Sequence, residues 1–175
     1  NPGGRLPITF YRDENDLPPF DDYNMTNRTY RYFTGDPLYK FGYGLSYTSF
    51  AYRDLQITPA QAVSGETITV QVEVENTGSR SGDEVVQLYV QDVEASLPVP
   101  QLQLQGFTRI RLNPGEKQTV QFTLMPEQLS FADDNGQWVL EPGVFNLWVG
   151  GQQPNLGAGG QPANVLGGEL ITSQF

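Results

Sequence analysis

The stretch TITVQVEVE, residues 67–75, has an apolar side chain at every second position. The apolar positions are Ile68, Val70, Val72 and Val74. Side chains of a β-strand point alternately to the two faces of a sheet, so this alternation is typical of a strand with one buried face. We therefore predict a strand here, with a buried core behind its apolar face.

The same alternation returns in three further windows of the chain. Their apolar positions are Val86, Leu88 and Val90; Val120, Phe122 and Leu124; and Phe145, Leu147 and Val149. Turn-forming tripeptides lie between or beside the windows: Asn76-Thr77-Gly78, Asn113-Pro114-Gly115, Asp134-Asn135-Gly136 and Glu141-Pro142-Gly143. Glycine supplies a positive φ in such turns and proline presets φ. About seven short strands without helices, in residues 50–175, predict an all-β fold: an antiparallel sandwich of immunoglobulin or fibronectin type III shape.

Two details of this sandwich are also predicted. The alternation shifts phase between Leu104 and Ile110, and Gly106 is the position where a β-bulge would absorb the extra residue. Residues 150–168 are rich in Gly, Gln, Pro and Asn, so we expect a long loop there, followed by a last strand over residues 169–175.

Residues 1–49 have a different character from the rest of the chain. A short apolar run at residues 6–11 predicts one strand, and the remainder reads as extended loop without helical periodicity. The stretch RTYRYFTGDPLYKFGYGLSYTSF, residues 28–50, is dense in aromatic rings interleaved with glycine and proline. The chain begins with Asn1 rather than methionine, so we expect it to be a piece of a longer polypeptide, or one chain of a nicked enzyme.

Composition excludes several classes of function. The chain has no cysteine and no histidine, which removes disulfides, thiolate chemistry, His-containing zinc sites and Ser-His or Cys-His catalysis. A formal net charge of -10 disfavours duplex nucleic acid or an anionic membrane surface as a partner. No apolar run approaches the roughly 20 residues of a membrane helix. We expect no cofactor and no metal.

Four stretches together resemble the C-terminal end of glycoside hydrolase family 3 enzymes, in order and spacing. They are NPGGRLPITF (residues 1–10), the aromatic stretch of residues 28–50, LQGFTRIRLNPGEKQTVQFTL (residues 104–124) and LEPGVFNLWVGG (residues 140–151). The phrase LPPFDDYNMTNRTYRYFTGDPLYKFGYGLSYTSF is most similar to the bacterial β-xylosidase branch, and β-glucosidases share much of the pattern.

The resemblance implies an architecture larger than this chain. Such enzymes have a (β/α)8-like barrel, an α/β sandwich domain and a fibronectin type III-like domain. Residues 1–49 would be the C-terminal tail of the α/β sandwich domain with its linker, and residues 50–175 the fibronectin type III-like domain. The partners would be the catalytic domains of the parent enzyme. The resemblance also implies a periplasmic or extracellular location and a retaining hydrolase acting on terminal β-linked sugars.

No residue of this chain matches the catalytic stretches of the family, so we assign no catalytic residue. Carboxylates that could be considered are Asp13, Glu14, Asp16, Asp21, Asp22, Asp133 and Asp134. Adjacent residues of a strand point to opposite faces, which suits the neighbouring aspartates poorly for shared catalysis, and aspartate before Asn-Gly usually forms a turn. A calcium loop over residues 13–17 is disfavoured against a solvated loop. Asn24 and Asn27 satisfy the glycosylation acceptor pattern, a weak signal.

The aromatic stretch allows two interpretations. Its rings either form a platform for sugars, with Gly42 and Gly44 bringing the backbone close to a ligand, or pack a joint between two domains. We favour the joint, with individual rings lining a cleft: Tyr30, Tyr32, Phe33, Tyr39, Phe41, Tyr43 and Tyr47. Trp138 and Trp148 are predicted core or interdomain rings. The leading hypothesis is a non-catalytic, stabilising portion of a family 3 enzyme; the alternative is a carbohydrate-binding or adhesion module.

Overall fold

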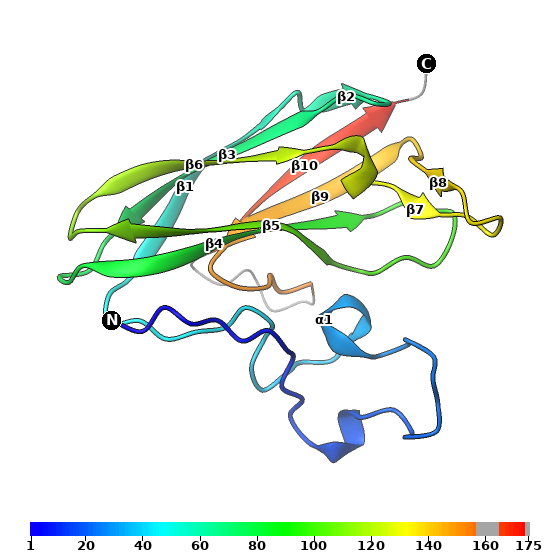
Figure 1. The fold of residues 1–175 in the computed structure, drawn as a ribbon, viewed down its shortest axis with the longest axis horizontal. Coiled ribbons are helices and arrows are strands. Elements are labelled where there is room, and N and C mark those ends of the chain that lie inside the picture. The colour runs from blue at the N-terminus through cyan, green and yellow to red at the C-terminus, as the bar shows by residue number, and fades with distance from the viewer. Residues whose placement is uncertain (157–164, 174–175) are drawn as a thin grey trace.

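The computed structural model describes residues 1–156 and 165–173, and they contain a β-sandwich of two sheets (Figure 1). The three-stranded sheet has the order β1-β3-β6, with β1 at Phe50–Thr58, β3 at Ile68–Asn76 and β6 at Lys117–Leu124. The two neighbouring pairs of this sheet are antiparallel. The stretch TITVQVEVE therefore lies in the central strand, as its alternation predicts.

The second sheet has five strands in the order β2-β10-β9-β4-β5. They are β2 (Gln61–Val63), β10 (Val165–Ser173), β9 (Gly143–Gly150), β4 (Gly82–Asp92) and β5 (Gln103–Leu112). Short β2 pairs with β10 in parallel, and the other pairs are antiparallel. A small hairpin is formed by β7 (Phe131–Ala132) and β8 (Trp138–Val139), after the 3-10 turn η2 (Pro126–Gln128). The predicted all-β, fibronectin type III-like sandwich is confirmed.

The main core fills the space between the two sheets. Every apolar position of the four alternating windows belongs to it, with Phe122 partly buried at its edge. Val70, Val74, Leu88 and Leu147 have essentially no exposed surface. Complete burial of such side chains contributes roughly 1.5–3 kcal/mol each, which makes this core the main source of the sandwich's stability.

Strand β4 is buried on both of its faces. Val86 and Leu88 point into the main core, while Tyr89 belongs to a second buried cluster on the opposite face. Gln87, on the same face as Tyr89, is also buried. The outer face of the five-stranded sheet is therefore covered in this region, by residues 1–49 together with the loop that follows β9.

Strand β5 contains the predicted bulge. Leu88 pairs with Gly106 while Tyr89 pairs with Leu104, so Gln105 is the extra residue. A side chain at position 106 would come within 2.9 Å of the Phe122 ring, which explains why glycine occupies the position beside the bulge.

The last strand starts earlier than its sequence indicates. We expected a loop up to residue 168, but β10 begins at Val165, and Gly167 and Gly168 pair with Trp148 and Leu147. A Cβ on Gly168 would meet Ile57, and one on Gly167 would meet Trp148. These glycines leave room for neighbouring side chains instead of marking a loop. The expected loop positions 157–164 and strand positions 174–175 lie outside the described residues.

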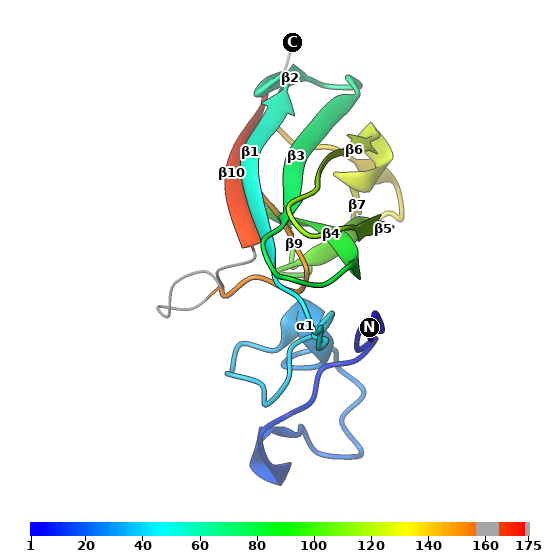
Figure 2. The same cartoon turned by 90° about the vertical axis from the view of Figure 1, so that its left-hand side faces the viewer.

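Residues 1–49 form a layer of irregular chain beneath the sandwich (Figures 1 and 2). They contain the 3-10 turn η1 (Glu14–Asp16) and one short helix, α1 (Thr29–Tyr32). The strand expected at residues 6–11 is absent; the segment has a single bridge between Phe10 and Tyr39 and two backbone hydrogen bonds between Leu6 and residues 42–43. An apolar run becomes a strand only where a neighbour offers a continuous ladder, and residues 39–43 offer isolated contacts. No helix among the described residues has the length and apolar character needed to cross a membrane.

Candidate functional site

The candidate site is the joint between residues 1–49 and the outer face of the five-stranded sheet. Strands β4 and β9 present Tyr89 and Trp148 on this face, and both rings are buried. A second apolar cluster forms around them, with Phe41, Leu104 and Leu156 packed against it; its buried members are Tyr30, Tyr89, Leu102 and Trp148. The sequence predicts that both Trp148 and Trp138 are core or interdomain rings. Trp148 is buried in this joint, whereas Trp138 is 73% exposed on the β7–β8 hairpin and is not a core residue of this chain.

Tyr30 is the central ring of the joint. It stacks on Phe41 with ring centroids 4.2 Å apart and planes 22° apart, and it meets Tyr89 edge to face at 6.2 Å. Its hydroxyl accepts a hydrogen bond of 3.1 Å from the backbone N–H of Leu104 in β5. A ring that is 9% exposed, contacts two other rings and is hydrogen-bonded at its hydroxyl is packed as a core side chain and is not available as a sugar platform.

Phe33 is held one turn later on the same side of α1 as Tyr30. Only 5% of it is exposed, and the Tyr11 ring meets it edge to face at 4.8 Å. Gln101 binds the backbone on this side, since its N–H donates to the carbonyl of Arg31 at 2.8 Å and its side-chain amide donates to the carbonyl of Phe33 at 2.5 Å. Helix α1 is therefore fastened to the chain segment that enters β5.

The other four predicted rings are not members of this buried cluster. Tyr39 is 42% exposed and Tyr47 is 69% exposed, while Tyr32 and Tyr43 are partly exposed. Tyr39 and Tyr43 lie 5.0 Å apart but are tilted by 36°, and Phe10 meets Tyr39 at 80°. The near-parallel pair among the described rings, Tyr30 with Phe41, is inside the joint. The structure thus divides the seven predicted rings between the joint and a second, outward surface.

An open groove of about 520 Å³ lies on this outward surface. It is lined by Gly4, Arg5, Leu6, Phe10, Tyr39, Tyr43, Gly44 and Leu45. Its wall is largely apolar, and Leu45 is 67% exposed.

Gly42 and Gly44, which the sequence suggested could lie close to a ligand, lie close to other residues of the chain. Gly42 has φ 79°, and a Cβ there would come within 2.9 Å of the Tyr89 hydroxyl and closer still to the Gln87 amide oxygen. Its carbonyl and that of Gly151 accept hydrogen bonds from the Gln87 side chain. A Cβ on Gly44 would strike the carbonyl oxygen of Gly4 and the Arg5 guanidinium.

A buried ion pair also joins the two parts of the chain. The Arg5 guanidinium donates to the Glu84 carboxylate at 2.8 Å, and the Tyr52 hydroxyl donates to the other carboxylate oxygen at 3.0 Å. Side-chain exposure is 11% for Arg5 and 3% for Glu84. Burial raises the pKa of Glu84 above its ordinary value of 4.5, against the opposing attraction of Arg5. Burial, followed by the charge of Glu84, raises the pKa of Tyr52.

Several of the candidate carboxylates accept hydrogen bonds in turns and caps. Asp13 caps η1 by accepting from the N–H of Asn15 at 2.7 Å, and Asp133 accepts from the N–H groups of Asn135 and Gln137 at 2.9 and 2.8 Å. Asp22 accepts from the backbone N–H of Asn24. These bonds are those of Asx turns and caps, as the sequence interpretation favoured. Within residues 1–156 and 165–173, no group of three or more acidic side chains is arranged to hold a metal ion.

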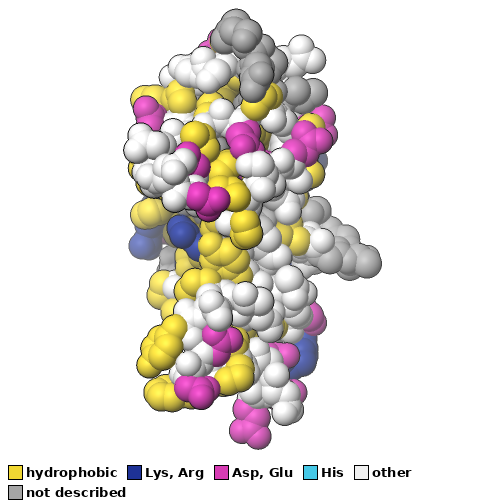
Figure 3. All heavy atoms as spheres, turned by 90° about the vertical axis from the view of Figure 1, so that its right-hand side faces the viewer, with side chains coloured by type: hydrophobic (Ala, Val, Ile, Leu, Met, Phe, Trp, Pro, Cys, Tyr) yellow, Lys and Arg dark blue, Asp and Glu magenta, His cyan; other side chains and the backbone are white. Residues whose placement is uncertain are grey.

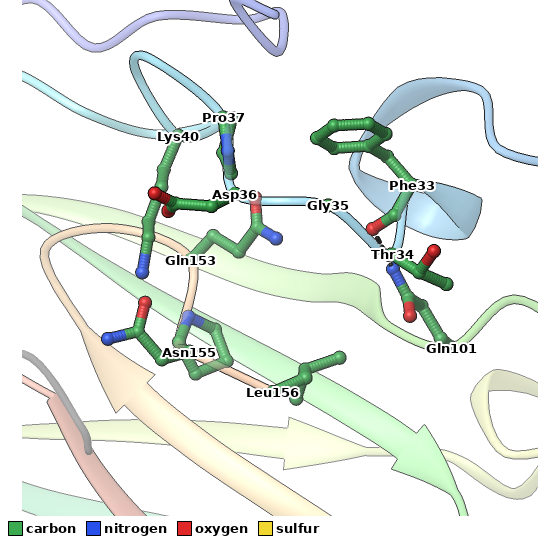
Figure 4. Close-up of a pocket in the computed structure, with 11 residues that line it drawn as sticks. Phe33, Thr34, Gly35, Asp36, Pro37, Lys40, Gln101, Gln153, Asn155 and Leu156 are labelled. Carbon is green, nitrogen blue, oxygen red and sulfur yellow. Dashed lines mark hydrogen bonds between the residues drawn. The ribbon is translucent and has the colours of Figure 1, made fainter. Parts of the chain in front are cut away.

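A cavity of about 630 Å³ opens beside the joint, between residues 33–40 and the loop that follows β9 (Figure 4). Gln153 is 8% exposed, and its backbone N–H donates to the Phe41 carbonyl at 3.1 Å. Half-buried Lys40 stands at the same cavity; burial lowers the pKa of its ammonium, and the charge of Asp36 opposes that shift.

Sequence reasoning missed Arg5, Glu84, Lys40 and Gln153. One signal was available in the sequence. Glu84 lies two residues before Val86 and therefore on the same, core-facing side of the strand, and a carboxylate buried there requires a partner. The partner itself is 79 positions away, and no local pattern indicates it.

Two family models match the chain, one in the irregular N-terminal segment and one in the sandwich. The model described as "Glycosyl hydrolase family 3 C-terminal domain" matches residues 1–47, and "Fibronectin type III-like domain" matches residues 84–153. A periplasmic β-glucosidase of Salmonella typhimurium is 41% identical over 162 residues, covering 86% of this chain and 21% of that protein. A β-xylosidase of Formosa agariphila is 41% identical over 155 residues, with the same coverage.

Solved structures agree. A β-glucosidase from Erythrobacter marinus superposes with a TM-score of 0.80 at 34% identity, over 98% of this chain and 22% of that one. β-Glucosidase 3B from Thermotoga neapolitana gives 0.80 at 34% identity, over 97% and 24%. Together, the fold and the matches define a chain that corresponds to the C-terminal portion of glycoside hydrolases. The chain belongs to glycoside hydrolase family 3, among its β-glucosidase- and β-xylosidase-like members.

The chain spans about a fifth of the length of the curated relatives that it matches. The two family models leave residues 48–83 unmatched, so the boundary between residues 49 and 50 stays a prediction.

Proposed function

We infer that this chain is the non-catalytic C-terminal portion of a retaining β-glycosidase that releases terminal β-linked xylose or glucose. Its role is structural: it holds residues 1–49 on the sandwich and presents their outer surface to the rest of the enzyme. The partners would be the barrel and the α/β sandwich domain of the parent. Because the relative from Salmonella typhimurium is named periplasmic, we propose a periplasmic or extracellular location for the whole protein.

One observation carries this proposal. Of the fifteen large hydrophobic residues that are exposed in the described part of the chain, ten lie within residues 1–47: Ile8, Phe10, Leu17, Phe20, Tyr23, Met25, Leu38, Tyr39, Leu45 and Tyr47. Figure 3 shows hydrophobic side chains exposed on this lower part of the molecule, with others on the sandwich above it. A soluble protein rarely exposes a large contiguous apolar surface without a partner.

The greater length of the relatives supports the proposal that this surface meets another part of the same enzyme. About four fifths of their length has no counterpart in this chain. Residues 1–47 match the C-terminal domain model of the family, which supports the proposal that their apolar side packs against the part of the longer protein that has no counterpart here. The predicted cleft rings Tyr39, Tyr43 and Tyr47 are on this outward side, and we propose that they line the contact with that part.

Co-purification tests the structural role. The catalytic part of a parent enzyme is expressed without its C-terminal fifth and mixed with a tagged form of this chain. We expect a stable complex with a higher melting temperature than the catalytic part alone. Phe20, 99% exposed, is changed to Ser on the apolar surface, and Trp138, 73% exposed, is changed to Ser on the sandwich as a matched control.

The Phe20→Ser variant should weaken the complex, because burying a Phe side chain contributes about 1.5–3 kcal/mol, while Trp138→Ser should not. Equal effects of both changes would argue against the assigned surface. The purified chain should release no nitrophenol from nitrophenyl xyloside or glucoside. Turnover that disappears when a carboxylate of this chain is changed would overturn the non-catalytic role.

A further inference from the structure

The cavity beside the joint has the size of a ligand site and is not used by the proposed structural role. Its volume of about 630 Å³ falls within the range of roughly 300–1,000 Å³ that is usual for small-molecule sites. Residues 33–40 form one wall, the loop of residues 153–156 forms another, and Gln101 closes one end (Figure 4). In this view Lys40, Gln153 and Asn155 lie at one end, and Phe33 lies at the other.

Two polar groups at this cavity lack protein partners in the described part of the chain. The amide oxygen of Gln153 is buried and accepts no hydrogen bond. The ammonium of Lys40 has no hydrogen bond and no ion pair within 4.0 Å, although Asp36 acts on it electrostatically; the Asp36 carboxylate is instead paired with Arg12 at 2.7 Å. Buried polar groups of folded proteins normally have partners, so these two leave an acceptor and a donor for a bound molecule.

A hydroxyl group fits this pair, because it can donate to the Gln153 oxygen and accept from the Lys40 ammonium. The remaining wall includes apolar surface from Phe33, Pro37 and Leu156, which suits the C–H face of a sugar ring. The cavity lining carries one acidic side chain, Asp36, beside the single ammonium of Lys40, and the chain as a whole carries -10, which disfavours anions.

We propose that this cavity binds a short neutral carbohydrate, of the size of a mono- or disaccharide. Lys40 and Gln153 hold its hydroxyl groups. The site is a hollow between two loops, distinct from the aromatic platform that the sequence suggested, since the rings nearest to it serve the joint. Binding here would give this part of the chain a role in carbohydrate recognition, which the family descriptions of its two matched regions do not mention.

Titration of the 175-residue chain tests the site directly. The ¹⁵N-labelled chain is titrated with xylobiose, with cellobiose and, as an anionic probe, with glucuronate. We expect saturable shifts of the backbone signals of Gly35, Lys40 and Asn155 at millimolar xylobiose or cellobiose, and weaker binding of glucuronate. Shifts confined to Tyr47 or Trp138, absence of saturation, or tighter binding of glucuronate would each overturn the proposal.

Variants identify the two contacts. Lys40→Met keeps the aliphatic stem and removes the ammonium, and Gln153→Leu removes the amide while leaving its backbone hydrogen bond to Phe41. Each should weaken binding by about tenfold or more, the loss expected for one hydrogen bond to a charged or buried group. Lys117→Met is the matched control, because Lys117 is the other lysine of the chain and lies on β6, and it should bind as the unaltered chain does.

Unchanged affinity in both Lys40→Met and Gln153→Leu would overturn the site. The shift map of the unaltered chain decides the question even if Gln153→Leu fails to fold. The outcome is separable from the structural role, because the titration uses this chain alone, whereas the structural role is tested by complex formation with the catalytic part.

Discussion

The guanidinium of Arg5 lies 2.8 Å from the carboxylate of Glu84, and the two residues belong to different parts of the chain. Arg5 is in the irregular N-terminal segment, and Glu84 is on the core-facing side of β4. Because both side chains are buried, each depends on the other for its charge to be tolerated. The pair fixes where the N-terminal segment meets the sandwich.

Removing either Arg5 or Glu84 alone should therefore strongly destabilise the folded chain. We expect Glu84→Leu to lower the free energy of unfolding by about 3–5 kcal/mol, since it leaves a buried guanidinium without a counterion. The double variant Arg5→Met, Glu84→Leu should recover much of this loss. The exposed pair Arg12–Asp36 is the control, and Arg12→Met should cost about 0–1 kcal/mol. Urea unfolding gives the free energy of unfolding of the three variants and of the unaltered chain. A double variant less stable than Glu84→Leu would contradict the prediction.

The same carboxyl gives stability a pH dependence of defined sign. Burial raises the pKa of Glu84 in the folded chain above 4.5, so the folded state holds this proton more tightly than the unfolded state does. Its contribution is fully present below the unfolded pKa and is lost as pH rises through the raised folded pKa. The difference in unfolding free energy between the wild-type chain and Glu84→Gln should thus decrease as pH rises above 4.5.

Urea titrations at a series of pH values check this, with Asp83→Asn for comparison. The hydrogen bond from Arg109, ahead of the charges of Arg109 and Arg111, lowers the pKa of Asp83, which lies at the surface. The contribution of Asp83 should be lost as pH falls through its folded pKa, so its difference curve should slope in the opposite direction. Two curves of the same slope would refute the assignment.

Aromatic truncation separates the joint rings from the outward rings. Tyr30→Ala removes a 9%-exposed ring that contacts Phe41 and Tyr89, and we expect a loss of about 3–5 kcal/mol. Tyr47→Ala, at a position that is 69% exposed, should change stability by less than about 0.5 kcal/mol in this chain. Thermal and urea unfolding measure both, and a large cost at Tyr47 would show that its ring is packed in this chain.

Two glycines with nearly the same φ allow the steric effect of a Cβ at the joint to be separated from backbone strain. Gly42 and Gly115 have φ 79° and 74°, but a Cβ on Gly115 meets nothing within 4 Å, whereas one on Gly42 would strike Gln87 and Tyr89. Alanine at either position bears the left-handed strain of about 1–2 kcal/mol. Gly42→Ala should lower the melting temperature clearly more than Gly115→Ala does. Equal melting temperatures of the two variants would mean that the joint accommodates the extra methyl group at no cost in stability.

The sandwich could be predicted from the sequence because its signals are local. Alternation in TITVQVEVE and its three sister windows requires only that neighbouring residues face opposite sides, and the phase shift before Gly106 shows the bulge. The same local logic misjudged Gly167 and Gly168, whose role in β10 is to make room for Trp148 and Ile57. It also predicted a strand at residues 6–11, where no continuous partner is present.

The candidate site was less accessible to such reasoning. The aromatic stretch was identifiable by composition, yet the division of its rings between inside and outside depends on which of them meet Tyr89 and Trp148. The cavity brings together Lys40 and Gln153, which are far apart in the chain and lie in stretches that read only as loop. Contacts between distant loops are set by the packed fold, and no periodicity encodes them.

Strand β4 has one face in each buried cluster, since Leu88 packs in the main core and Tyr89 in the joint. Loosening of the N-terminal segment would therefore expose the back of a strand that the sandwich also needs. The two parts are thermodynamically linked through this one strand and should unfold as a single cooperative unit. Amide hydrogens of residues 86–90 should exchange with deuterium only through global opening, at the slowest rate in the chain.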